Sequence, residues 1–184
     1  ERRTTTLTIA GQVFPVETIP FSEAFGGSRQ LMLARTAEEL TRLDCRGYIL
    51  LLSGDLTANP LSPKDYPFYY PDEHREVIDL LEQKGPGAIV AVTGATPLSG
   101  KNPFPLFEDG NFLIPSANID THTFQCIEPL LSAGAAADLS IRSRKKPGRS
   151  RQIVATRKAV APKGKIVLAA HMDSKYDTPG ALDN

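Results

Sequence analysis

Uninterrupted apolar runs alternate with polar turns through the first 142 residues of the chain. Two of these runs, residues 48–52 (Tyr-Ile-Leu-Leu-Leu) and 88–92 (Ala-Ile-Val-Ala-Val), contain no polar position. A strand that is apolar on both faces is typical of a parallel sheet covered on both sides. We therefore predict that these two runs form adjacent central strands.

Between the apolar runs the spacing of apolar residues changes to a helical period. Residues 73–84 carry a single apolar stripe, which the sequence Gly85-Pro86-Gly87 ends. The stripe consists of Val77, Ile78, Leu80 and Leu81. A capping-box sequence at residues 36–39 (Thr-Ala-Glu-Glu) predicts a shorter helix, and a third helix is expected at about residues 123–133. The pattern as a whole predicts an α/β fold.

Shorter segments complete this part of the chain. We read Gly26-Gly27-Ser28 as a loop, and residues 57–71, with four prolines and four aromatics, as a long loop. Further β-like pieces are expected at residues 7–9, 13–16, 31–33, 112–114, 116–119 and 139–142.

Four segments follow from these patterns. Residues 1–29 form an N-terminal β segment and residues 30–142 a mixed α/β domain. A basic joint at residues 143–152 leads to the first strands of a second α/β domain in residues 153–184. Its strands are expected at residues 153–156 and 166–170. We favour a solvated linker for the joint over a phosphate-binding surface, because it contains no aromatic residue to stack on bases.

Composition excludes several functional classes. The 184 residues suit one domain, or one domain and a piece of another. Lys+Arg and Asp+Glu each number 21, so no overall field attracts nucleic acid or an anionic membrane. No apolar stretch approaches the roughly 18 residues that a membrane span requires. Because the chain opens on Glu1-Arg2-Arg3 and stops inside a motif, we expect a fragment at both ends.

The isolated cysteines and histidines suggest structural roles. Cys45 and Cys126 match no metal-ligand spacing, and we expect both to be buried, with a disulfide left open. His74 shares a helical face with the apolar stripe, so a packing role is favoured over metal ligation. His122 precedes a predicted helix, where capping or a surface position suffices.

An aromatic cluster lies in the long loop, at Tyr66, Phe68, Tyr69 and Tyr70. Prolines on both sides stiffen it. Core packing is the favoured interpretation, and a rigid apolar wall beside a substrate cleft is the alternative.

The last twenty residues carry the clearest chemistry. The apolar run 166–170 predicts a buried strand, and functional groups of parallel sheets lie at the carboxyl ends of strands. His171 and Asp173 follow directly, and residues i and i+2 of an extended chain point to one side. Pro179-Gly180-Ala181 then forms a turn that delivers Asp183. An imidazole and a carboxylate are ligands that zinc accepts.

The strings His-Met-Asp-Ser and Thr-Pro-Gly-Ala-Leu-Asp-Asn resemble the metal-binding motifs of dizinc aminopeptidases, the family of bacterial leucyl aminopeptidases and glutamate carboxypeptidase. The resemblance implies that His171 binds one zinc, that Asp183 bridges two zinc ions, and that Asp173 orients the histidine as a catalytic-site residue. It also implies a peptide or protein substrate and a secreted or cell-envelope location. In the family an adjacent Glu pair, a further acidic ligand and a last His follow these motifs, and the sequence given stops before them, so we expect the fragment itself to be inactive.

Residues 30–142 are similar to the protease-associated domain that is commonly inserted in these peptidases. The likeness lies in the order of elements and in the pieces Arg-Gly-Tyr-Ile-Leu-Leu, Gly-Ala-Ile-Val and Ile-Pro-Ser. An alternative function is therefore a non-catalytic module that binds proteins or peptides, with a degenerate peptidase half. The intact His171, Asp173 and Asp183 argue against that alternative.

Overall fold

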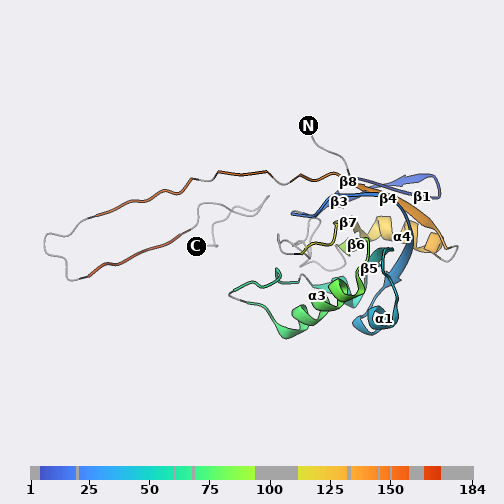
Figure 1. Cartoon of the computed structure of the whole chain (residues 1–184), viewed down its shortest axis with the longest axis horizontal. Helices are drawn as coiled ribbons and strands as arrows, with labels where there is room; N and C mark the ends of the chain where they lie inside the picture. Colours follow the sequence, from blue (N-terminus) through green and yellow to red (C-terminus); the bar gives the residue numbers. More distant parts are fainter. Residues whose placement is uncertain are drawn as a thin grey trace. The chain divides into compact units, whose positions relative to one another are not determined.

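The structure is a computed structural model of the 184-residue chain. It describes residues 5–19, 21–59, 61–67, 69–93, 112–131, 134–144, 146–149, 151–157 and 164–170. The chain divides into two units, Glu1–Lys146 and Pro147–Asn184. All the helices and strands among the described residues lie in the first unit (Figure 1).

The first unit is built on an eight-stranded mixed sheet in the order β2-β1-β8-β4-β5-β6-β7-β3. Strands β4, β5, β6 and β7 run parallel to their neighbours within this group, whereas the remaining pairings are antiparallel. The strands are β1 (Thr6–Ile9), β2 (Gln12–Phe14), β3 (Glu17–Thr18), β4 (Phe25–Ala34), β5 (Ile49–Leu52), β6 (Ala88–Thr93), β7 (Ser116–Asp120) and β8 (Ala136–Ile141). The predicted α/β class is confirmed.

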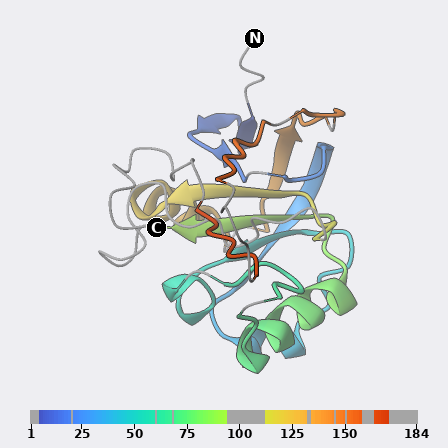
Figure 2. The same ribbon diagram turned by 90° about the vertical axis from the view of Figure 1, so that its left-hand side faces the viewer.

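Helices cover the parallel strands from both faces. They are α1 (Ala37–Arg42), α2 (Asp55–Ala58), α3 (Asp72–Lys84) and α4 (Thr121–Leu131). Leu50 and Leu52 of β5 pack in one apolar cluster with residues of α1, α2 and α3. Ile49 and Leu51 belong to a second cluster that contains Ile127 of α4. Alternate side chains of one strand thus enter opposite layers, and Figure 2 shows the green α3 along one side of strands β6 and β7.

The prediction that β5 and β6 are adjacent and central is confirmed. Residues Ile49 to Leu52 of β5 pair in parallel with Ala88 to Ala91 of β6, and β4 and β7 flank the pair. Every residue of both strands is buried. A central strand of this kind loses no hydrogen-bonding edge to solvent, which explains why it tolerates a wholly apolar sequence.

The predicted loop at Gly26-Gly27-Ser28 is wrong, because these residues belong to β4. The first part of this strand, Phe25 to Gln30, pairs antiparallel with β8, and its last part, Leu31 to Ala34, pairs in parallel with β5. Gly27 has φ 139, a value that side-chain-bearing residues rarely adopt. The pairing partner comes from the far end of the unit, so no local pattern could have indicated it.

The predicted helices are confirmed with small changes of boundary. Thr36 caps α1, since its hydroxyl accepts a hydrogen bond from the Glu39 N–H at 3.2 Å. The Glu39 carboxylate accepts in turn from the Arg35 N–H at 2.7 Å. Gly85, in the left-handed conformation, ends α3 by donating to the Leu81 carbonyl. The Thr36 cap matches the helix start that the capping-box sequence predicts, and Gly85 matches the predicted helix end.

Two further boundaries differ from expectation. Residues 112–114 form no strand; Phe112 is buried in the cluster beside α3, so its apolar character reflects packing alone. The short helix α2 occupies the start of the predicted long loop.

The strands predicted at residues 153–156 and 166–170 are not observed. Neither segment is assigned to a strand or helix, and Ile166 and Leu168 are 90% and 94% exposed. Both have the composition of a buried strand. A strand needs a hydrogen-bonded neighbour and a covered face, however, and composition alone does not supply them.

Gly87 directly precedes β6 and packs against the backbone of the turn that precedes β5. We therefore expect Gly87→Ala to destabilise the chain by about 1–3 kcal/mol. A Cβ at this position would lie 3.0 Å from the Gly47 carbonyl oxygen. Gly26→Ala is the matched control, because its Cβ would meet no atom within 4 Å. Urea unfolding of both variants measures the difference, and equal midpoints would contradict the packing described.

Candidate functional site

The three predicted metal-site residues lie outside the described residues. His171, Asp173 and Asp183 follow the described segment 164–170, whose apolar side chains are exposed. Among the residues that the structure describes, no three His, Cys, Asp or Glu side chains are grouped so that they could hold a metal ion. The prediction of convergence at the end of the 166–170 segment therefore remains a prediction.

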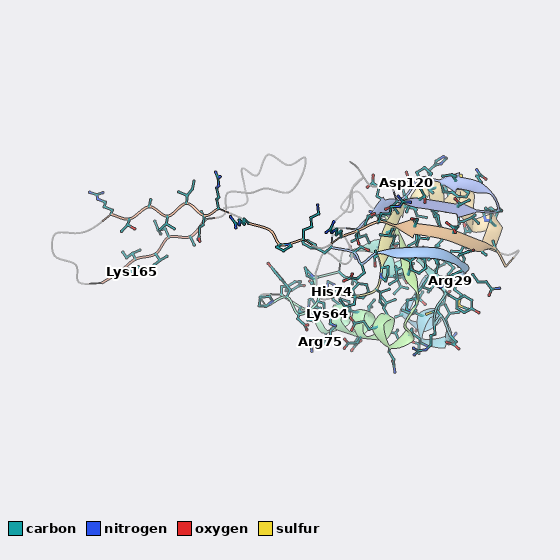
Figure 3. The ribbon with its side chains drawn as sticks, turned by 45° about the horizontal axis from the view of Figure 1, so that its top comes forward. Arg29, Lys64, His74, Arg75, Asp120 and Lys165 are labelled. Carbon is teal, nitrogen blue, oxygen red and sulfur yellow. The ribbon has the colours of Figure 1, made fainter. Side chains whose placement is uncertain are left out.

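Polar side chains at the carboxyl ends of the parallel strands in the first unit form local hydrogen bonds. The Thr93 hydroxyl donates to the Ile119 carbonyl at 3.2 Å, and the Thr121 hydroxyl donates to the Thr93 carbonyl at 3.2 Å. Asp120, labelled in Figure 3, accepts from the Thr123 N–H at 2.7 Å. This carboxylate caps the start of α4, as an aspartate before a helix commonly does.

His74 fastens the long loop to α3. Its Nδ1 accepts a hydrogen bond from the Ser62 N–H at 2.9 Å and lies 3.2 Å from the Ser62 hydroxyl. An Nδ1 that accepts carries no proton, so the ring proton of the neutral imidazole is on Nε2. The structure thus confirms a structural histidine, and His122 is exposed on α4, as expected for a surface position.

Two further contacts hold the same loop (Figure 3). Lys64 Nζ donates to both carboxylate oxygens of Glu82 at 2.8 Å, and this hydrogen bonding raises the pKa of Lys64. The Arg75 guanidinium lies 5.3 Å from the centre of the Tyr70 ring. Burial raises the pKa of the Tyr70 hydroxyl. The loop is therefore anchored along α3 by a histidine, an ion pair and a cation–π contact.

Core packing describes only part of the aromatic cluster. Tyr70 packs against the apolar cluster beside α3. Tyr66 and Tyr69 are 44% and 66% exposed, so the packing prediction is wrong for them. Phe68 lies outside the described residues. Prolines in the loop restrict the backbone and keep its outer rings in solvent.

The two cysteines differ in environment. Cys45 is buried, as predicted, and burial raises the pKa of its thiol. Cys126 is exposed, contrary to prediction, because Thr123 and Ile127 form the face of α4 that meets the sheet. Both are free thiols.

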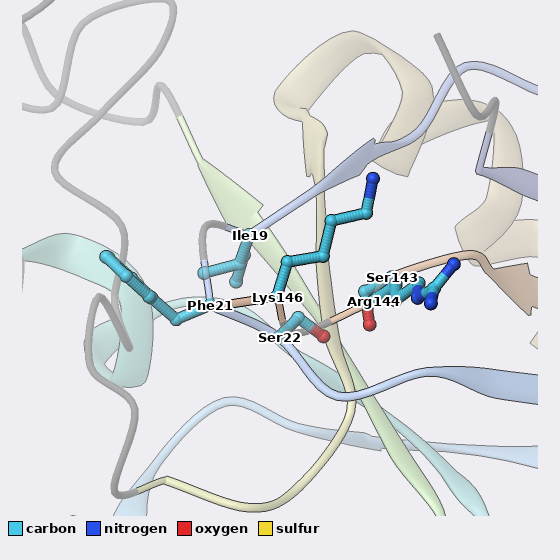
Figure 4. Close-up of a pocket in the computed structure, with 6 residues that line it drawn as sticks. All are labelled: Ile19, Phe21, Ser22, Ser143, Arg144 and Lys146. Carbon is cyan, nitrogen blue, oxygen red and sulfur yellow. The ribbon is translucent and has the colours of Figure 1, made fainter. Parts of the chain in front are cut away.

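A pocket of about 350 Å³ lies beside β3 (Figure 4). It is lined by Ile19, Phe21, Ser22, Ser143, Arg144 and Lys146. The Ser22 N–H donates to the Ile19 carbonyl at 3.1 Å, which closes a tight turn. The Ser22 hydroxyl accepts from the buried Ser116 N–H at 2.7 Å and so fixes this turn to the start of β7.

The pocket has an apolar wall and a cationic rim. Phe21 is 63% exposed and has φ 64, a left-handed backbone that bulky side chains rarely adopt. Arg144 and Lys146 are exposed, and neither forms an ion pair within the described part of the chain. In the sequence these cations belong to the predicted linker, and Phe21 is not among the predicted site residues. The sequence signal that could have identified Phe21 is an apolar residue placed between turn-forming residues.

None of the described helices combines the length and apolar character needed to cross a bilayer.

Comparison with known proteins gives a structural likeness only. No protein-family model and no curated protein matches the chain. An aminopeptidase from Aneurinibacillus sp. strain AM-1 is 17% identical with a TM-score of 0.52, covering 75% of this chain and 30% of that one. A peptidase M28 precursor from Shewanella amazonensis is 14% identical with a TM-score of 0.50, covering 74% and 34%. A zinc aminopeptidase from Bacillus subtilis is 22% identical with a TM-score of 0.49, covering 74% and 29%.

The chain spans about a third of the length of these solved structures. At such identities the likeness to the Aneurinibacillus and Shewanella structures shows a shared fold. It establishes that this α/β architecture occurs within aminopeptidase chains.

We expect His74→Ala to destabilise the chain by about 1–2 kcal/mol, because the half-buried Ser62 N–H loses its hydrogen-bond acceptor. His122→Ala serves as the control and should change stability by less than about 0.5 kcal/mol, as exposed positions do. Thermal unfolding of the two variants compares them. Equal losses would show that the Ser62 contact contributes nothing.

Thiol labelling should distinguish the two cysteines. One equivalent of Ellman's reagent should react rapidly with the native chain at Cys126, and a second only after unfolding, because the thiolate is the nucleophile and Cys45 is buried with a raised pKa. Cys126→Ser should abolish the rapid phase. Fast reaction of two equivalents would contradict the burial of Cys45.

Proposed function

We propose that the chain is part of a zinc-dependent exopeptidase, an aminopeptidase that hydrolyses peptide bonds with a metal-activated water. The observation that carries the proposal is the sequence from His171 through Asp173 to Asp183, placed directly after the apolar run 166–170. The likeness of the fold to aminopeptidase chains supports it. Residues 30–142 correspond in this proposal to a protease-associated type of domain, and residues 153–184 to the start of the catalytic domain.

The donor set fits zinc by its chemistry. Neutral imidazole nitrogen and carboxylate oxygen are both common zinc ligands. In the proposal His171 and Asp183 would hold the zinc, Asp183 as a ligand shared by both ions, and Asp173 would hold the imidazole in the tautomer that leaves a ring nitrogen free for the metal. Bound zinc would supply a water of lowered pKa and polarise the scissile carbonyl. His74 is not a candidate, since its Nδ1 accepts from the Ser62 N–H and the ring proton on Nε2 leaves that nitrogen no lone pair for a metal.

We expect the 184-residue chain by itself to bind zinc weakly and to leave aminoacyl chromogenic substrates intact. A catalytic zinc keeps about three protein ligands per ion, and only one imidazole and one bridging carboxylate are assigned here. A longer form of the protein that supplies the other ligands and a general base should bind zinc tightly and hydrolyse these substrates. Zinc analysis and initial rates of both forms measure this. Full activity of the 184-residue chain would overturn the assignment.

Substitutions in the active, longer protein should separate the role of the histidine from that of Asp173. His171→Ala should remove zinc from one site together with activity, whereas Asp173→Asn should retain the fold and weaken zinc affinity by about 10- to 100-fold. His122→Ala is the matched control and should retain both properties. If His171→Ala binds the full amount of zinc, the ligand assignment is wrong.

A further inference from the structure

We propose that the pocket beside β3 binds a peptide segment that carries a carboxylate next to an apolar side chain. The pocket is formed by Ile19, Phe21, Ser22, Ser143, Arg144 and Lys146, all within the first unit. The peptide class rests on the proposed peptidase function. Binding to this pocket is measured without catalysis, so the two proposals can fail separately.

Phe21 provides the first argument. Its ring is 63% exposed, and its backbone has φ 64. A left-handed backbone is unfavourable for a bulky residue, and glycine would close the same turn without strain. The fold therefore holds an aromatic ring in solvent at the pocket edge at the expense of local stability. Strained residues that the surroundings hold in place are characteristic of ligand-contacting positions.

The hydrogen bonds behind Phe21 make this wall rigid. Ile19 donates its N–H to the Ser116 carbonyl at 3.2 Å and is almost fully buried. Ser22 accepts from the Ser116 N–H at 2.7 Å and donates to the Glu23 carbonyl at 2.9 Å. The turn is thus fixed to β7 on both sides of Phe21. A preformed apolar surface of this kind binds without the entropic loss of ordering a loop.

The opposite side of the pocket supplies positive charge. Arg144 and Lys146 line the pocket from the segment that follows β8 (Figure 4). Neither cation has a carboxylate partner among the described residues. The guanidinium offers a planar fork of donors for a carboxylate, and the ammonium adds a second charge. The Ser22 hydroxyl is already engaged, so recognition of the anion falls to the two cations and to Ser143.

The dimensions fit a short segment of peptide. A volume of about 350 Å³ lies at the lower end of the range for ligand sites, roughly 300–1,000 Å³. Such a space accommodates one or two residues of an extended chain. The combination of a phenyl wall with two cations selects an acidic group adjacent to an apolar one.

Amide chemical shifts of the full 184-residue chain, titrated with N-acetyl-Leu-Asp-Leu-amide, test the proposal. Shifts at Phe21, Ser22 and Ser143 that saturate are expected, with binding weakened at higher salt concentration because the cations are exposed. The Asn analogue, N-acetyl-Leu-Asn-Leu-amide, should bind several-fold more weakly. Equal binding of the two peptides, or shifts confined to other surfaces, would overturn the proposal. Acetate that competes as strongly as the peptide would overturn the peptide requirement.

Two sets of variants assign the contributions. Arg144→Gln and Lys146→Gln should each weaken binding of the acidic peptide by about 2- to 5-fold, as exposed charge pairs do. Arg149→Gln, an exposed cation of the same joint outside the pocket lining, is the control and should retain the wild-type affinity. An equal loss in the control would show attraction by net charge without a defined site.

Phe21 provides a second, independent readout. Phe21→Ala and Phe21→Gly both remove the ring and should weaken binding equally, but Phe21→Gly should melt about 2 °C or more above Phe21→Ala because it relieves the left-handed backbone. Their folding is checked by the same melting curves. Wild-type affinity in both variants would show that the ring takes no part in binding.

Discussion

Burial of β5 and β6 on both faces is the constraint on which the rest of the fold depends. Their side chains enter two separate apolar clusters, so each face must be covered. Helices α1, α2 and α3 meet this requirement on one face, and α4 with β1 and β8 meets it on the other. At roughly 1.5–3 kcal/mol for each large apolar side chain removed from water, these strands contribute a major part of the stabilisation.

The layers also determine where recognition can occur. The carboxyl ends of the parallel strands hold polar groups, but Thr93 and Asp120 are engaged in local hydrogen bonds. The outer strand β3 instead leads into the turn that presents Phe21, and the segment after β8 brings Arg144 and Lys146 to the same place. A recognition surface formed by the periphery of a rigid core is common, because loops can change while the core does not.

Short sequence patterns correctly predicted those features of the fold that can be recognised within a single segment. The Thr36 cap and the Gly85 terminus depend on neighbours in sequence, and the burial of β5 and β6 is visible in their uninterrupted apolar composition; each is found as expected. The strand at Gly26 to Ser28 depends on β8, more than a hundred residues away, and no local pattern encodes that pairing. The exposure of Cys126 likewise follows from which face of α4 meets the sheet.

For the candidate site, sequence motifs indicated His171, Asp173 and Asp183 through their residue types and spacing. The pocket beside β3 joins residues 19–22 to residues 143–146, a juxtaposition that arises only when the sheet is assembled. The basic residues of the joint were visible in the sequence, whereas the position of residues 143–146 beside the turn at residues 19–22 was not.

The double pairing of β4 has a consequence for the order of folding. Its first half requires β8, and Leu7 of β1 also lies opposite Leu139 of β8. During synthesis, β1 and β2 leave the ribosome long before their partner exists, whereas β5 and β6 can pair earlier. Closure of such distant segments is slow because chain entropy is lost before the contacts form. The free edge of β1 therefore stays unpaired until β8 has been synthesised, and an unpaired strand edge of this kind favours association with other chains.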